Sequence, residues 1–199
     1  MSGPAEDLEL LRRFLERGQA AVQPDAGHLV FWGLALCAGL ALQYPAEVLD
    51  WAPSAVLWIW QPLAVMIWAG ALIRRRGRGP GAHPTQRASR AVFAAAALAV
   101  AASYAGGLAG RMPDGYPTVL VACTAAASAF VVLAALTGRA TAWAAAAGWF
   151  GLLAWFSWRG RLEPHDFLVL ALACAALLAL PGLLLGRPLR VRPGRGVFS

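Results

Sequence analysis

Three side chains capable of acid–base or metal chemistry lie within four residues of one another: Glu163, His165 and Asp166. Carboxylates and imidazole bind divalent cations and can exchange protons with a substrate. The spacing therefore predicts a metal site or an acid–base site. Two other interpretations remain open. Arg159 and Arg161 are close enough in sequence to pair with the acids, and Asp166 suits the N-cap of a following helix.

A second polar feature, Gln61-Pro62, lies within a long apolar segment. Proline removes one helix hydrogen bond and clashes with the preceding turn, which predicts a kink and frees the carbonyl of Trp58. If the kink faces the helix bundle, Trp58, Gln61, Tyr104 and Trp155 would line a ligand-binding pocket. The alternative is a packed kink in which Gln61 bonds to a neighbouring helix. Neither interpretation specifies a cofactor.

The composition excludes several other chemistries. The chain contains no lysine, which excludes a Schiff base to retinal or pyridoxal phosphate and excludes a P-loop. Its three cysteines lie in apolar segments without a C-x-x-C pair, which argues against a thiol oxidoreductase or an iron–sulfur site. The long apolar segments contain no Asp, Glu, Lys or Arg, which argues against a proton pump or a voltage sensor.

The elements that would position these residues are transmembrane helices. Apolar and aromatic residues make up 59% of the 199-residue chain and only 14% are charged, whereas a soluble domain carries about 25% charged residues. A chain of this length cannot bury so much apolar surface in its own interior, so we expect lipid around it. We predict an all-α polytopic membrane protein with a transmembrane domain over residues 28–186. Its six predicted transmembrane helices cover residues 28–44, 55–73, 91–110, 118–137, 142–158 and 167–185.

Two polar segments flank this domain. We expect residues 1–27 to contain an amphipathic helix at 4–17, whose leucines recur at helical spacing, and then a linker. We predict that residues 187–199 form a basic tail. Both segments are predicted to lie in the cytoplasm.

The distribution of arginines predicts this orientation. Arg111, Arg159 and Arg161 fall on one side of the predicted membrane. The other fourteen fall on the opposite side: Arg12, Arg13, Arg17, Arg74, Arg75, Arg76, Arg78, Arg87, Arg90, Arg139, Arg187, Arg190, Arg192 and Arg195. Arginine-rich loops stay in the cytoplasm, so both termini are expected there, in the inner or plasma membrane. We expect these arginines to bind anionic lipid headgroups and expect no nucleic-acid binding.

Small residues recur in three of the predicted spans and predict close helix contacts. The longest ridge lies in residues 91–110 and ends in Gly106 and Gly110. A short pattern also recurs, as Phe31-Trp32-Gly33-Leu34 and as Trp149-Phe150-Gly151-Leu152. It would fit three antiparallel hairpins descended from one, although interfacial aromatics and acidic helix starts are typical of unrelated spans too.

Leu10-Leu11-Arg12-Arg13, followed by Phe31-Trp32-Gly33-Leu34, resembles the start of small, uncharacterised multi-spanning bacterial membrane proteins. The resemblance covers about the first forty residues of the chain. It implies a bacterial membrane protein and brings no activity, cofactor or site with it.

Three functions fit these patterns. The first is an integral membrane accessory, regulatory or scaffold subunit without catalytic activity, partnered by another membrane protein or by a second copy of the chain. The alternative is a transporter or substrate-capture subunit for a neutral, largely apolar solute, with an outward-facing pocket near Gln61. The third is a membrane-embedded enzyme that uses Glu163, His165 and Asp166.

Overall fold

The computed structural model describes residues 26–51, 53–76, 84–106 and 115–185. Every regular element within these ranges is a helix, which confirms the all-α prediction. The helices are α2 (Ala26–Val48), α3 (Pro53–Arg76), α4 (Pro84–Gly106), α5 (Tyr116–Thr137), α6 (Ala140–Arg159), and α7 (Pro164–Cys174), which continues through the π-helix η2 (Ala175–Ala179) into α8 (Leu180–Leu185). The predicted amphipathic helix at 4–17 and the basic tail lie outside the described residues.

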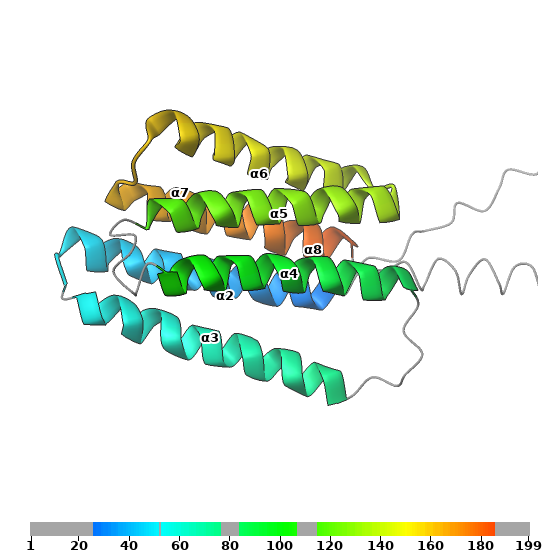
Figure 1. The fold of residues 1–199 in the computed structure, drawn as a ribbon, viewed down its shortest axis with the longest axis horizontal. Helices are drawn as coiled ribbons and strands as arrows, with labels where there is room; N and C mark the ends of the chain where they lie inside the picture. Colours follow the sequence, from blue (N-terminus) through cyan, green and yellow to red (C-terminus); the bar gives the residue numbers. More distant parts are fainter. Residues whose placement is uncertain (1–25, 52, 77–83, 107–114, 186–199) are drawn as a thin grey trace, which may run out of the picture.

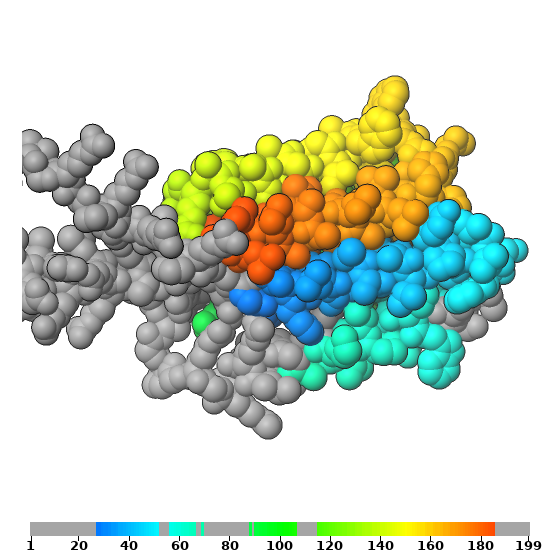
Figure 2. Space-filling model, turned by 180° about the vertical axis from the view of Figure 1, so that it is seen from behind, coloured from blue at the N-terminus to red at the C-terminus, as the bar shows by residue number. Residues whose placement is uncertain are grey.

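The helices lie side by side along one common direction (Figure 1). Helix α5 packs against α4 and α6, and α2 packs against α3 and against the continuous α7–η2–α8 helix. Helix α6 lies at one edge of the bundle and α3 at the opposite edge (Figure 1). Seen from behind, α2 in blue runs directly alongside α7 and α8 in orange and red (Figure 2). The first and last helices of the described chain are therefore neighbours.

Three helical segments are long and apolar enough to cross a membrane: Gly27–Val48, Tyr116–Thr137 and Pro164–Leu185. They match the first, fourth and sixth predicted spans, and their length and composition are compatible with a membrane protein. Two shorter apolar segments, Val56–Met66 and Arg90–Gly106, lie within α3 and α4. Helix α4 begins at Pro84 rather than at residue 91, because polar residues extend the helix beyond its apolar part.

Left-handed residues end three of these helices. Asp50 follows α2 with a φ of 50°, and the next backbone N–H, that of Trp51, donates to the carbonyl of Ala46 at 2.9 Å. Gly138 and Gly160 take the same role after α5 and α6, with φ values of 64° and 69°. The two glycines adopt this left-handed conformation without steric cost, so the chain can reverse within a few residues.

The buried core lies between α5, α6 and the α7–η2–α8 helix, where Phe130, Phe156 and Leu133 have almost no exposed surface. The tightest approach is elsewhere, between α2 and the π-helix. A Cβ atom added to Gly33 would lie 2.5 Å from the backbone nitrogen of Ala179. The two helix backbones thus nearly touch at this point.

The predicted small-residue ridge on residues 91–110 is wrong in its described part. Ala95, Ala99 and Ala102 are exposed on α4, and a Cβ atom added to Gly106 would meet nothing within 4 Å. The two short patterns also differ in environment, since Gly33 faces a neighbouring backbone whereas Gly151 faces open space. Small residues therefore mark a close helix contact on α2 and not on α4.

Candidate functional site

The predicted acidic cluster lies at the turn that joins α6 to α7. Glu163 is the N-cap of α7, Pro164 begins the helix, and Asp166 is the third helical residue. Glu163 and Asp166 form a capping box, in which the backbone N–H of Glu163 donates to Asp166 Oδ2 at 2.8 Å. Asp166 therefore caps α7 from inside the first turn, which corrects its expected place as the N-cap itself.

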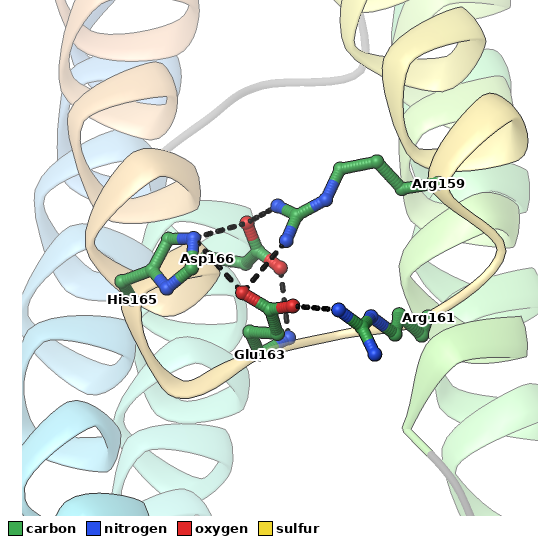
Figure 3. A network of polar contacts seen from close by, with 5 residues as sticks. All are labelled: Arg159, Arg161, Glu163, His165 and Asp166. Carbon is green, nitrogen blue, oxygen red and sulfur yellow. Dashed lines mark hydrogen bonds and ion pairs between the residues drawn. The ribbon is translucent and has the colours of Figure 1, made fainter.

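Arg159, the last residue of α6, pairs with both carboxylates (Figure 3). Its Nη1 donates to Asp166 Oδ1 at 2.5 Å, and its Nη2 lies 2.8 Å from Glu163 Oε2. The Asp166 side chain is 1% exposed and that of Arg159 is 17% exposed. Arg161 approaches Glu163 from solvent, with Nη2 2.7 Å from Oε1. Two guanidinium groups thus enclose two carboxylates and link the end of α6 to the start of α7.

His165 lies beside this network and contacts it loosely. Its Nε2 is 3.4 Å from Glu163 Oε2 and 3.6 Å from Asp166 Oδ1, and its side chain is 58% exposed. The imidazole forms an ion pair here only when it is protonated. His165 is therefore a peripheral member of the cluster, and Arg159 is its central cation.

The pKa values of the paired groups follow from this geometry. The hydrogen bond from Arg159 is the main cause that holds the pKa of Glu163 below its usual range, and it outweighs partial desolvation of the carboxylate. Desolvation alone would lower the pKa of Arg159, but its hydrogen bond to Glu163 and the charges of both acids raise it overall. Both groups are therefore charged at neutral pH, as a structural ion pair requires.

The structure brings Glu163, His165 and Asp166 together, as the metal hypothesis requires, but places Arg159 and Arg161 among them. Within the described ranges, no group of three or more His, Cys, Asp or Glu side chains is arranged to hold a metal ion. Guanidinium groups occupy the carboxylate oxygens that a cation would need and would repel it. Metal binding at this cluster stays a prediction, and ion pairing explains the geometry.

The four predicted ligand-binding residues lie on three different helices. Trp58, which is 77% exposed, and Gln61 are on the surface of α3. Tyr104 lies on α4, and its buried hydroxyl has no hydrogen-bond partner in the structure. Trp155 lies on α6 at the opposite edge of the bundle, with the Arg159 guanidinium 5.8 Å from its ring centroid (Figure 1). A pocket shared by these residues stays a prediction.

Sequence reasoning missed a second arginine link at the other end of α6. Arg139 Nη1 donates to the carbonyl oxygen of Leu185 at 2.7 Å, so it binds the last turn of α8. The two residues are 46 positions apart and no local pattern relates them. Only the arginine's place in the short α5–α6 turn could have suggested that it reaches a neighbouring helix end.

No protein-family model, curated protein or solved structure matches this chain. The residues themselves are therefore the basis for the function proposed below. Of the candidate sites, the α6–α7 cluster is a network of ion pairs, and the pocket expected around Gln61 stays a prediction.

Proposed function

We propose that this protein is an integral membrane protein with six transmembrane helices. On this proposal it works as an accessory, regulatory or scaffold subunit that has no catalytic activity of its own. The observation that supports this proposal most strongly is the ion pairing of the acidic cluster at the α6–α7 turn. Glu163 and Asp166, the two carboxylates of the predicted acid–base cluster, pair with Arg159 and link α7 to α6. An enzyme of this size would need such groups to be aimed at a substrate.

The surface of the bundle supports a membrane location. Large apolar side chains with at least half of their surface exposed occur on α2, the α2–α3 turn, α3, α4, α6 and the α7–η2–α8 helix. They are Leu34, Leu42, Val48, Leu49, Trp51, Trp58, Val65, Met66, Leu98, Trp143, Trp158, Leu172, Leu180 and Leu183. An apolar surface spread over so many helices is costly in water and suits lipid.

The distribution of charge over the bundle supports the proposed orientation. Arg74 to Arg76 end α3, and Arg139 precedes α6, so they lie at one end of the bundle (Figure 1). Arg159 and Arg161 lie at the other end, beside two acids. With the first end in the cytoplasm, the arginine-rich side lies inside, as the positive-inside rule requires.

Cysteine labelling tests the topology. In a variant with alanine in place of the native cysteines, Leu49→Cys and Ala140→Cys mark opposite ends of the bundle, and both residues are exposed. We expect an impermeant thiol reagent to label the first in intact cells and the second only after the membrane is opened. Labelling of Ala140→Cys from outside would contradict the orientation, and release of the protein by carbonate washing would contradict membrane insertion.

Native mass spectrometry of the gently extracted protein tests the subunit proposal. We expect lipid and a second polypeptide to remain bound, either a different membrane protein or a second copy. The transporter alternative predicts a retained small solute that is lost on Gln61→Leu. A monomer that holds such a solute and no second chain would overturn the accessory role.

A further inference from the structure

The exposed surface of helix α3 includes a stripe of residues at helical spacing. Trp58, Gln61, Val65 and Ala69 are spaced by three or four residues and are all exposed, so they lie on one face of the helix. The opposite face meets α2. A Cβ atom added to Gly39 would lie 2.9 Å from Leu63 Cδ2.

A polar bond secures the α2 side of α3. Trp60 Nε1 donates to Gln43 Oε1 of α2 at 2.9 Å, and Gln43 Nε2 donates to Glu47 Oε1 at 3.1 Å. The outer stripe has no such partner, because no hydrogen bond to the Gln61 amide occurs in the described part of the chain. The side-chain amide of Gln61 therefore faces outward without a hydrogen-bond partner among the described residues.

Gln61 is deep in the proposed membrane. It lies three residues from the centre of the predicted span 55–73, or about 4.5 Å along a helix. At that depth water is absent, and an unpaired amide is costly to leave in hydrocarbon. Pro62 leaves a second polar group without its helical hydrogen bond, because it has no N–H to donate to the carbonyl of Trp58. A lipid-facing polar group of this kind indicates that another protein surface covers it.

A second copy of this chain can provide hydrogen-bond partners for the Gln61 amide through twofold symmetry. The Gln61 amide has a positive N–H end and a negative oxygen, so two copies related by a twofold axis can each donate to the other. The donor and the acceptor of each Gln61 amide are thereby paired with the other copy, and no other polar residue is needed. Ala69, one helical turn beyond Val65, has no bulk that would hold the two backbones apart.

We propose that two copies of this chain form a twofold dimer in the membrane through the outer stripe of α3, with their Gln61 side chains hydrogen-bonded to each other. This inference rests on the proposed function, because it requires α3 to span the membrane. It deepens that function by assigning the partner, a second copy, and the helix that meets it. Both copies insert in the same orientation, so the twofold axis lies along the membrane normal, the two α3 helices pair in parallel, and stripe residues close to the axis lie near their own counterparts.

Site-directed cross-linking tests the interface. In the variant with alanine in place of the native cysteines, Val65→Cys should give a covalent dimer under mild oxidation in membranes. Leu42→Cys, which is also exposed but lies on α2, is the matched control and should stay monomeric. Cross-linking through Leu42→Cys and not through Val65→Cys would overturn the assignment of α3.

Gln61→Leu tests the amide pair. Energy transfer between donor- and acceptor-labelled copies in liposomes gives the dimer dissociation constant, which should rise about eightfold for two lost interhelical bonds. Gln61→Asn, which keeps an amide, should recover part of this loss. The thermal unfolding midpoint of the monomer should not change, since Gln61 has no hydrogen-bond partner in the described part of its own chain. An unchanged dissociation constant would overturn the amide pair.

The labelling experiment with Leu49→Cys and Ala140→Cys separates the two proposals. Correct topology together with a monomer at every protein-to-lipid ratio would overturn the dimer and leave the membrane proposal intact. Capture of a different protein by Val65→Cys would overturn the second copy as the occupant of the stripe. A failure of α3 to insert would instead overturn the six-span proposal.

Discussion

Helix α2 meets its two neighbours in different ways. On one face, a Cβ atom at Gly33 would lie 2.5 Å from the backbone nitrogen of Ala179. A Cβ atom at Gly182 of α8 would lie 2.9 Å from the backbone nitrogen of Val30. On the face toward α3, the atoms nearest to a Cβ atom at Gly39 would be the end of the Leu63 side chain, at 2.9 Å, and the Trp60 ring, at 3.3 Å. One contact joins backbones and the other joins side chains.

The difference determines which contact can adjust. Side chains can change rotamer at small cost, whereas two helix backbones can separate only if whole helices move. Ala179, the last residue of the π-helix η2, lies at this backbone contact with Gly33. A π-helix has a wider turn than an α-helix, so the backbone opposite Gly33 departs from α-helical geometry. The α2–α8 contact is therefore fixed, and α3 is attached more adaptably, as suits a helix that we propose to meet a partner.

Gly33→Ala should have the largest effect of any single methyl group in the described structure. Alanine favours a helix over glycine by about 1 kcal/mol, so any loss of stability must come from the collision with Ala179. Overpacking typically costs about 1–3 kcal/mol, and we expect the upper end because the colliding atoms are backbone. The thermal unfolding midpoint in detergent measures this effect.

Gly39→Ala is the matched control on the other face of α2. It adds the same methyl group to the same helix, and Leu63 can rotate away from it. We expect a change in the unfolding midpoint that is much smaller than that of Gly33→Ala. If Gly39→Ala were the more destabilising of the two, the distinction between a fixed and an adaptable face would be wrong.

Asp166→Ala should have the next largest effect, since it breaks the link between α6 and α7. It removes the hydrogen bond that Asp166 accepts from the backbone N–H of Glu163, worth about 0.5–1.5 kcal/mol, and leaves Arg159 with Glu163 alone. Arg161→Ala, at a side chain that is 75% exposed, is the control and should change the unfolding midpoint little. The metal hypothesis predicts instead that divalent cations raise the midpoint of the parent protein and not that of Asp166→Ala.

The same link predicts how stability depends on pH. The pKa of Glu163 is lowered in the folded protein, mainly by its hydrogen bond from Arg159, and is about 4.3 in an unfolded chain. Between these two values the unfolded state binds more protons, so stability rises with pH. The contribution of Glu163 is complete above about pH 4.3 and is lost as the pH falls through the lower, folded pKa. Glu163→Gln should remove this part of the decline, and a variant with the parent's pH profile would contradict the assignment.

The sequence was sufficient to predict the helices but not the way in which they face one another. Long apolar segments located α2, α5 and the α7–η2–α8 helix, because length and composition alone define a candidate span. The same uniform apolarity hides the rotation of each helix, since no polar stripe distinguishes its inner from its outer face. This is why Gly33, whose close contact the sequence did not reveal, packs against Ala179, and why Gly106 does not pack.

The candidate sites also show that sequence predicts local contacts better than contacts between distant helices. The pairing of Arg159 with the acids could be predicted because all the residues lie within a single turn region of eight positions, from 159 to 166. The pocket around Gln61 depended on which way α3 faces and on the distance between α3 and α6. Neither quantity is encoded locally, so the sequence could not establish whether residues of α3 and α6, which lie at opposite edges of the bundle, share a pocket (Figure 1).

Gly106→Leu should have the smallest effect, although its residue belongs to the most conspicuous small-residue ridge of the sequence. A Cβ atom at Gly106 would meet nothing within 4 Å, so the larger side chain points away from the described helices and, on the six-span proposal, into lipid, where leucine is favourable. Leucine is also the better helix former, by slightly less than 1 kcal/mol. We therefore expect an unfolding midpoint that is equal to or above that of the parent, while the same substitution at Gly33 should prevent folding. A Gly106→Leu variant that unfolds earlier would mean that α4 turns this face toward a protein surface, and its dissociation constant in liposomes would show whether that surface belongs to a second copy.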